Sequence, residues 1–224
     1  MLARTLAAAA ALALLAGGAA AQRTDITVGM VLEPPNLDPT AGAAAAIDEV
    51  LYANVFEGLT RFAPDGAIVP ALAREWGVSE DGRIYTFQLH EGVTFHDGTA
   101  MTADDVVFTL DRARADDSTN AQKQLFAGIE TVEAVDDTTV RVTLAAADGA
   151  FPFKMAWGDA VIVAPESADT LATRPIGTGP FVFEEWVQGD RVELARNPDY
   201  WGDAPALERA TFKFISDPNA AFAA

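Results

Sequence analysis

The apolar positions near the start of the chain change from a period of two to a helical period. In residues 24–31 apolar side chains alternate with polar or small ones, which is typical of a half-buried strand. Three prolines then interrupt residues 33–39 and predict a stiff, ordered loop, because proline fixes φ and lacks an amide donor. Helical spacing begins at Ile47 and continues to Gly58, a plausible helix end. The pattern therefore predicts a strand, a loop and a helix in succession.

Patterns typical of strands dominate the middle of the chain. They occur between turns rich in Asp, Gly and Pro, at residues 59–62, 84–89, 130–135 and 139–144. One helix is expected to begin at Thr102, whose hydroxyl can cap the first amides while Asp104 and Asp105 complement the positive helix end. We interpret residues 61–160 as a compact α+β module.

The last part of the chain predicts a hairpin and one further strand. Residues 181–187 and 191–196 flank a short turn, and residues 210–215 form another alternating run. Asp217 and Pro218 are a good N-cap and first helical residue, yet barely one more turn of sequence follows. A helix that begins so close to the end suggests a truncated sequence, and a frayed natural terminus is the alternative.

Residues 1–21 have the pattern of an export signal. Arg4 gives the positive start, residues 6–15 are apolar, and the small residues 19–21 offer a cleavage site near Ala21. The apolar stretch is too short to span a bilayer, which needs about 20 apolar residues, and no later run comes close. The chain has no cysteine for a lipid anchor or a disulfide. We therefore predict a soluble periplasmic protein that begins at Gln22.

The charge of the chain argues against one class of partner. The sequence contains 33 acidic residues and 15 Lys and Arg residues, a formal net charge of -18. Nucleic acid binding needs clustered basic residues that displace counterions from phosphates, and no such cluster is present. We expect no nucleic acid partner, and the acidity by itself says little about the ligand.

Several segments together carry a resemblance to a known family. In chain order they include Glu33-Pro34-Pro35-Asn36-Leu37-Asp38-Pro39, Pro70-Ala71-Leu72-Ala73, Phe95-His96-Asp97-Gly98, Gly177-Thr178-Gly179-Pro180-Phe181 and Arg196-Asn197-Pro198-Asp199-Tyr200-Trp201. Through them the chain resembles family 5 of the bacterial extracellular solute-binding proteins. The resemblance covers nearly all of the chain after the signal.

The resemblance implies a mixed α/β fold, a lobe of the type II periplasmic binding protein kind. Residues 22–60 and 161–224 would form the first part of the main sheet of lobe I, and residues 61–160 an inserted α+β subdomain. Family members are longer, so we expect the second lobe to be missing from this sequence. Because the lobes close together on the ligand, the fragment alone is expected to bind weakly or not at all.

The function implied by the resemblance is capture of di- or oligopeptides for an ABC importer. The partners would be the peptide and the permease subunits in the inner membrane, and we expect a monomer. Within the same class, the ligand could instead be a nickel chelate, glutathione or another small solute. In a different class, a secreted hydrolase would need two carboxylates that the fold brings together.

Two loops are candidate ligand-binding segments. Leu32, Glu33 and Pro34 follow the first strand, at the kind of strand end where ligands bind in open sheets, and the resemblance implies that they line the cleft. Glu33 could meet a cationic group of a peptide held through its main chain, or it could be a solvated loop acid. Thr178 and Gly179 lie in a turn that the resemblance implies is near the crossing between lobes. Glycines in such turns more often serve close packing, and the strand that follows argues against a phosphate loop.

The sequence offers no recognisable catalytic or metal constellation. His90 and His96 are the only histidines and lack the spacing of zinc ligands, and we expect His96 to form local hydrogen bonds, to Asp97 or to the backbone. The four tryptophans are expected to fill cores. Adjacent acids such as Asp104 and Asp105 point in different directions and do not form catalytic pairs. We predict a binding protein that is not an enzyme and needs no cofactor.

Overall fold

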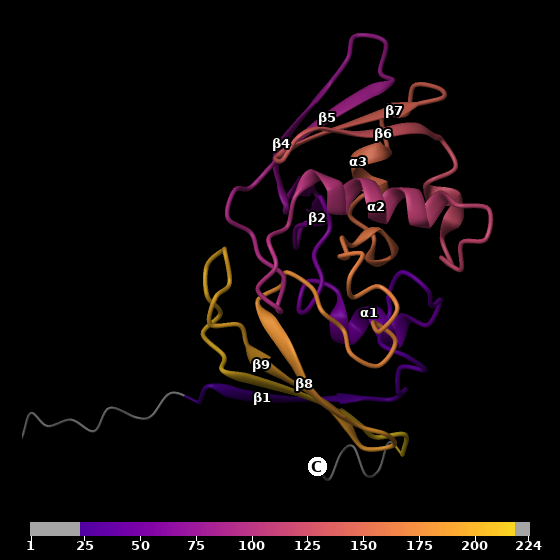
Figure 1. Ribbon diagram of the computed structural model, residues 1–224. Coiled ribbons are helices and arrows are strands. Elements are labelled where there is room, and N and C mark those ends of the chain that lie inside the picture. Colours follow the sequence, from indigo (N-terminus) through magenta and orange to yellow (C-terminus); the bar gives the residue numbers. More distant parts are fainter. Residues whose placement is uncertain (1–22, 218–224) are drawn as a thin grey trace, which may run out of the picture.

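Two four-stranded sheets form the framework of the molecule (Figure 1). The computed structural model describes residues 23–217. The first sheet has the order β1-β10-β9-β8, with strands β1 (Asp25–Met30), β8 (Phe181–Val187), β9 (Arg191–Arg196) and β10 (Arg209–Phe214). The second has the order β4-β5-β7-β6, with strands β4 (Ala73–Val78), β5 (Ile84–Leu89), β6 (Ile129–Asp136) and β7 (Thr139–Leu144).

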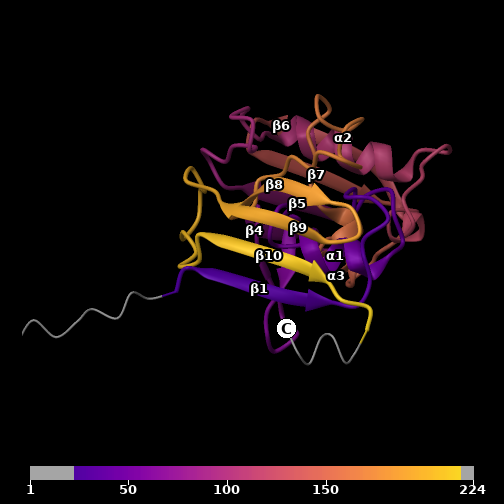
Figure 2. The same cartoon turned by 90° about the horizontal axis from the view of Figure 1, so that it is seen from below.

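The first sheet joins the two ends of the described chain. β1 pairs in parallel with β10, from Asp25 opposite Arg209 to Met30 opposite Phe214, whereas β10, β9 and β8 are antiparallel. Figure 2 shows β1 as an edge strand of this sheet. The predicted hairpin is present, and Gly189 in its turn has φ 75°. Left-handed backbone of this kind favours glycine.

β1 is less buried than its alternating pattern predicted. Met30 is buried, but Ile26 and Val28 are 42% and 37% exposed. Their partners on β10, Ala210 and Phe212, are each only 7% exposed. The difference arises because β1 is an edge strand, so its side chains have a strand neighbour on one side only.

The second sheet packs against the longest helix, α2 (Ala103–Arg114). The alternation in β5 buries Tyr85, Phe87 and Leu89 together, as predicted. Tyr85 and Phe87 also contact the ring of Phe151 in α3 (Phe151–Lys154). Burial of several aromatic and aliphatic side chains here supplies much of the apolar driving force for this unit.

α2 begins at the cap that the sequence predicts. Thr102 and Asp105 form a capping box, in which the amide of Thr102 donates to the Asp105 carboxylate at 2.8 Å. Val106 and Leu110 are fully buried, whereas Val107 is only partly buried. The amphipathic stripe and the cap therefore fix the start and the buried face of this helix.

The first helix is shorter than the apolar spacing suggested. α1 (Ala45–Leu51) is followed by Ala53, which adopts φ 58°, and the amide of Val55 donates to the carbonyl of Leu51 at 2.9 Å. Val55 is buried in this turn and does not belong to the helix. The expectation that the helix ends at Gly58 was therefore wrong, because a compact turn buries apolar residues at the same spacing as a helix.

In the described part of the chain, four shorter elements lie outside the two four-stranded sheets. They are β2 (Thr60–Phe62), its antiparallel partner β3 (Ile68–Pro70), and the 3-10 turns η1 (Lys123–Leu125) and η2 (Gly158–Ala160). Neither β3 nor β4 was predicted. In β4 only Ala73 is buried, so its sequence lacks the apolar alternation that marks the other strands of its sheet.

Two apolar cores, one beside each sheet, meet at a short buried segment. Val161, Ile162 and Val163 are all fully buried. Ile162 belongs to the core of the second sheet, whereas Val161 and Val163 belong to the core of the first. Successive side chains of an extended segment point to opposite sides, so this one segment fills both cores.

Two expectations fall on residues that the structure does not describe. The export signal at residues 1–21 and the helix expected from Pro218 onward lie outside residues 23–217. No helix in the described part of the chain is both long and apolar enough to cross a membrane.

Candidate functional site

The loop between β1 and α1 borders two hollows in the surface. An apolar groove of about 640 Å³ lies between the end of β1 and the first turn of α1. A polar pocket of about 330 Å³ lies between the loop and the C-terminal end of α2. Thr40 lines the polar pocket and Ala44 lines the apolar groove, so the same loop contributes to both.

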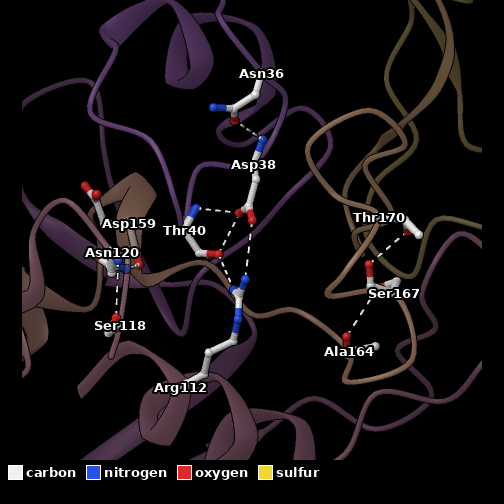
Figure 3. Close-up of polar contacts among 10 residues, drawn as sticks. All are labelled: Asn36, Asp38, Thr40, Arg112, Ser118, Asn120, Asp159, Ala164, Ser167 and Thr170. Atoms are coloured by element: carbon white, nitrogen blue, oxygen red, sulfur yellow. Dashed lines mark hydrogen bonds and ion pairs between the residues drawn. The ribbon is translucent and has the colours of Figure 1, made fainter. Parts of the chain in front are cut away.

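Side-chain hydrogen bonds hold this loop in one conformation (Figure 3). Asn36 accepts from the amide of Asp38 at 2.8 Å, and Asp38 accepts from the amide and hydroxyl of Thr40 at 2.8 and 2.6 Å. Arg112 of α2 donates to the Thr40 hydroxyl at 2.5 Å and forms an ion pair with Asp38 at 3.5 Å. Asp38 is only 4% exposed, so this pair is screened little by water. The loop is thereby attached to the helix that covers the second sheet.

The far wall of the polar pocket comes from the segment after α2. The side-chain amide nitrogen of Asn120 donates to the main-chain carbonyl of Asp159 at 2.9 Å (Figure 3). The side-chain oxygen of Asn120 accepts from the main-chain amide of Gln122. With Thr40 and Arg112 opposite, the pocket presents hydroxyl, amide and guanidinium groups. Such groups can hydrogen-bond to a polar ligand group.

Asp159 and Asp48 bring two carboxyl groups close together at the contact between η2 and α1. Asp159 is 7% exposed, and burial together with the Asp48 carboxylate raises the pKa of Asp159 to about 6. Burial also raises the pKa of Asp48. In residues 23–217 no group of three or more His, Cys, Asp or Glu side chains could hold a metal ion.

The apolar groove combines exposed apolar side chains with unpaired main chain. Val31 and Leu32 follow β1 directly and are 69% and 68% exposed. The outer side of β1 has no strand partner in the described part of the chain, because β1 is the edge of its sheet. Groups of this kind can pair with the main chain of an extended peptide.

Glu33 is neither free nor simply solvated. Its carboxylate accepts from the indole N–H of Trp186 at 2.8 Å and from the amide of Gly189 at 2.9 Å. Glu33 and Pro34 line a shallow hollow beside Trp186. Glu33 therefore ties the loop after β1 to the β8–β9 hairpin, a contact across more than 150 residues that the sequence did not suggest.

Thr178 and Gly179 lie in a buried turn that packs against the segment after α1. Thr178 is fully buried and donates to the Glu57 carboxylate at 2.9 Å. A Cβ atom on Gly177 would lie 2.1 Å from the carbonyl oxygen of Val55, and one on Gly179 would lie 2.4 Å from that of Asn54. Only glycine permits such an approach of two backbone segments. Within residues 23–217, no hydrogen bond joins this turn to Leu32, Glu33 or Pro34.

His96 holds the same turn from the other side. Its Nε2 lies 2.9 Å from the carbonyl oxygen of Gly179, and the amide of Gly177 donates to its Nδ1 at 3.4 Å. Burial lowers the pKa of His96, which agrees with a neutral ring that donates at Nε2 and accepts at Nδ1. His96 does hydrogen-bond to the backbone, but the expectation that this contact would be local was wrong, because both partners are more than 80 residues away.

Sequence reasoning missed the residues that line the polar pocket. Thr40, Arg112 and Asn120 belong to a loop, a helix and a turn that are far apart in sequence. None has a motif of its own, and only the tertiary contact between α2 and the loop brings them together. The one available signal was the proline-rich loop, since ordered loops are frequent binding segments.

The sequence of this chain matches a known protein family and several known proteins. Residues 67–224 match the family model described as bacterial extracellular solute-binding proteins, family 5 Middle. The chain is 35% identical to the glutathione-binding protein GsiB of Pectobacterium atrosepticum, covering 89% of this chain and 39% of the relative. It is 33% identical to di/tripeptide-binding protein 2 of Pseudomonas aeruginosa, covering 91% of this chain and 44% of the relative. The chain thus spans about two fifths of the length of these curated relatives.

Solved structures show the same fold. The oligopeptide-binding protein AppA of Bacillus subtilis, in complex with a nonapeptide, matches with a TM-score of 0.82 at 30% identity, over 89% of this chain and 41% of that structure. NikZ of Campylobacter jejuni, in complex with Ni(L-His), matches with a TM-score of 0.81 at 28% identity, over 90% and 41%. The predicted fold class, part of a type II periplasmic binding protein, is confirmed. The chain belongs to family 5 of the bacterial extracellular solute-binding proteins.

Proposed function

We propose that this chain forms part of the periplasmic solute-capturing component of an ABC importer, with di- and oligopeptides as its cargo. The observation that carries the proposal is the family match over residues 67–224. Relatives named for di/tripeptides and oligopeptides are 33% identical to it over about 90% of the chain. Members of the family are binding proteins for transport, so we expect ligand capture without turnover. The permease in the inner membrane would be its partner, and we expect it to act as a monomer.

The apolar groove is the part of the surface best suited to a peptide. An extended peptide that lies along the outer side of β1 would pair with main-chain groups, which accept any side-chain sequence. Val31 and Leu32 expose apolar surface next to it. Leu32 and Pro34 are the residues that we assign to ligand contact, Leu32 in the groove and Pro34 in the shallow hollow beside Trp186. The polar pocket across the loop would receive a polar end or side chain of the ligand.

Glu33, Thr178 and Gly179 act, in this proposal, by positioning the ligand-binding loop and not by free side-chain contacts. Glu33 already accepts two hydrogen bonds from the β8–β9 hairpin. Thr178 and Gly179 are buried against Glu57 and His96. A ligand would therefore meet a surface whose shape is set before binding, which lowers the entropy cost of binding.

The proposal is tested by titrating the isotope-labelled chain with a defined pool of di- to pentapeptides, followed by amide chemical shifts. This method detects weak binding, which we expect of a chain that spans about two fifths of the length of its relatives. Saturable shifts should appear at residues 28–32 and 44–46, on both sides of the apolar groove. Leu32→Asp should remove them, because it places a charge on the apolar contact surface. Val135→Asp, at another exposed apolar residue on β6, should leave them unchanged.

Other outcomes of the same titration count against the peptide assignment. Shifts in the groove with Ni(L-His) or with glutathione, but with no other peptide, would replace the cargo while keeping a solute-binding role. Cleaved peptide in the recovered sample, detected by mass spectrometry, would instead favour a hydrolase. The Asp48 and Asp159 carboxyl groups would then be the first to substitute.

A further inference from the structure

Another hollow, of about 460 Å³, lies away from the groove and the polar pocket. It is lined by Tyr52 and by the loop between β9 and β10, with Tyr200 and Trp201. The groove lies at the first turn of α1, whereas Tyr52 follows the last residue of that helix. The β9–β10 loop comes directly before β10, which runs parallel to β1. The loop therefore lies beside the start of β1, whereas the groove lies beside the end of β1. This hollow, which we call the aromatic cavity, therefore lies at the opposite end of the sheet. Figure 2 shows the strands β1 and β10 that define the two ends.

A half-buried carboxylate, that of Glu57, fixes the aromatic walls of this cavity. Glu57 accepts from the Tyr200 hydroxyl at 2.8 Å, from the Trp201 indole N–H at 2.9 Å and from the Thr178 hydroxyl at 2.9 Å. The ring of His90 lies with its centroid 4.6 Å from that of Trp201. The polar atoms of the two aromatic residues are thus used inside the protein, and their rings remain to line the cavity. Walls held in this way need little reorganisation on binding.

Two charges of opposite sign line the same cavity without neutralising each other. Arg61 and Asp203 are both exposed, and neither side chain forms a hydrogen bond or ion pair within residues 23–217. Burial and the Glu57 carboxylate raise the pKa of the Tyr200 hydroxyl, Arg61 opposes this rise and Asp203 adds to it. Arg61 and Asp203 therefore line the same cavity as Tyr200.

The cavity also has the size and rigidity of a small-molecule site. Its volume falls within the range of about 300–1,000 Å³ that is typical of ligand pockets. Pro70, Pro180 and Pro205 line it beside the aromatic rings. Rigid apolar walls with a few polar groups at the mouth are the usual composition of such sites.

We propose that the aromatic cavity is a second binding site, which takes the zwitterion of an α-amino acid with an aromatic side chain. Arg61 pairs with the ligand carboxylate, and Asp203 pairs with its ammonium group. The ligand ring lies against Trp201 and the prolines. A ligand with only one charge would leave either Arg61 or Asp203 without a partner, so both charges of the zwitterion are required.

The test uses the full chain labelled with ¹⁵N and L-phenylalanine as the probe. The indole N–H signal of Trp201, identified by its loss in Trp201→Phe, should shift saturably because this group lies in the cavity wall. Arg61→Gln and Asp203→Asn should each weaken binding by about tenfold or more, the effect of losing one charge-assisted hydrogen bond. Arg174→Gln and Asp169→Asn are matched controls, because these exposed charges lie outside the cavity, and they should leave binding unchanged.

Analogues of the ligand that carry a single charge test whether both charges of L-phenylalanine contribute to binding. 3-Phenylpropionate and phenethylamine should each bind at least about tenfold more weakly than L-phenylalanine. Equal binding of either analogue, or no saturable shift of the Trp201 signal at millimolar L-phenylalanine, overturns the proposal. Leu32→Asp should leave the response to L-phenylalanine intact while it removes the peptide response of the groove. The proposal for the groove and the proposal for the aromatic cavity can therefore be contradicted independently.

Discussion

At the scale of single residues, the polar contacts of this protein mostly serve to fix loops. Glu33 holds the loop after β1, Asp38 and Arg112 hold the loop before α1, and His96 holds the turn at Gly177. Each contact joins segments that lie far apart in the sequence. The chemistry of each side chain was visible in the sequence, but its partner was not, because partner choice depends on the path of the chain.

Gly177 offers the sharpest test at this scale. Gly177→Ala should lower the free energy of unfolding by about 3 kcal/mol, because its Cβ would lie 2.1 Å from the Val55 carbonyl oxygen and the backbone must move. Urea denaturation measures the change. Gly128→Ala is the control, since a Cβ there meets nothing within 4 Å and its φ is not left-handed. If both variants lowered the free energy of unfolding by the same small amount, the backbone at Gly177 would be able to move at little energetic cost, which contradicts the prediction.

At the scale of elements, the contact between α1 and η2 contains an unfavourable pair of acids. Asp48 lies on α1 and Asp159 on η2, and burial with the Asp48 charge raises the pKa of Asp159 to about 6. The unfolded value is about 3.9, so folding favours the protonated form of Asp159. The stability from this protonated form is present below about pH 4 and is lost as the pH rises through about 6.

Asp159→Asn should therefore stabilise the protein at neutral pH. We expect the free energy of unfolding to rise by about 2 kcal/mol at pH 7, and the gain to shrink as the pH falls toward 4 and to vanish below about pH 3, where the Asp159 carboxyl is neutral in both states. Urea denaturation between pH 4 and pH 7 measures this gain. Asp169→Asn, at an exposed acid, should change little. A gain that does not depend on pH would show that the charge of Asp159 is not the cause.

At the scale of the whole molecule, the two sheets are joined through a shared interior. Ile162 packs into the core of the second sheet and its neighbour Val163 into the core of the first, and both are fully buried. The loop before α1 and helix α2 add a second connection through Arg112. The groove and the polar pocket lie on either side of this loop, so their relative position depends on the packing between the two sheets.

Because the two sheets share this packed segment, we predict that they unfold together. Ile162→Ala and Val163→Ala should each cost about 2–4 kcal/mol, because each leaves a cavity in a packed core. Hydrogen exchange by mass spectrometry should show lower protection in both β5 and β9 for either variant. Val78→Ala, at a residue that is 55% exposed, should leave both protected. Loss of protection in only one sheet for each variant would show two independent units.

The sequence by itself determined the elements whose apolar pattern is local. β5, β7, β8 and β9 have the predicted bounds, and α2 begins at its predicted cap, because alternation and capping act between near neighbours. The loop at residues 32–34 was also found from its place after a strand. The length of α1 could not be found in this way, because Val55 satisfies the same spacing from a turn.

Only the tertiary structure decided which residues form the sites. Thr40, Arg112 and Asn120 meet in the polar pocket, and Arg61, Trp201 and Asp203 meet in the aromatic cavity, although each set spans long stretches of the chain. The edge position of β1, and with it the exposure of Ile26 and Val28, also follows from the sheet order and not from its pattern. The physical reason is that hydrophobic periodicity specifies which face of an element is buried, whereas the neighbours of that element are chosen by packing over the whole chain.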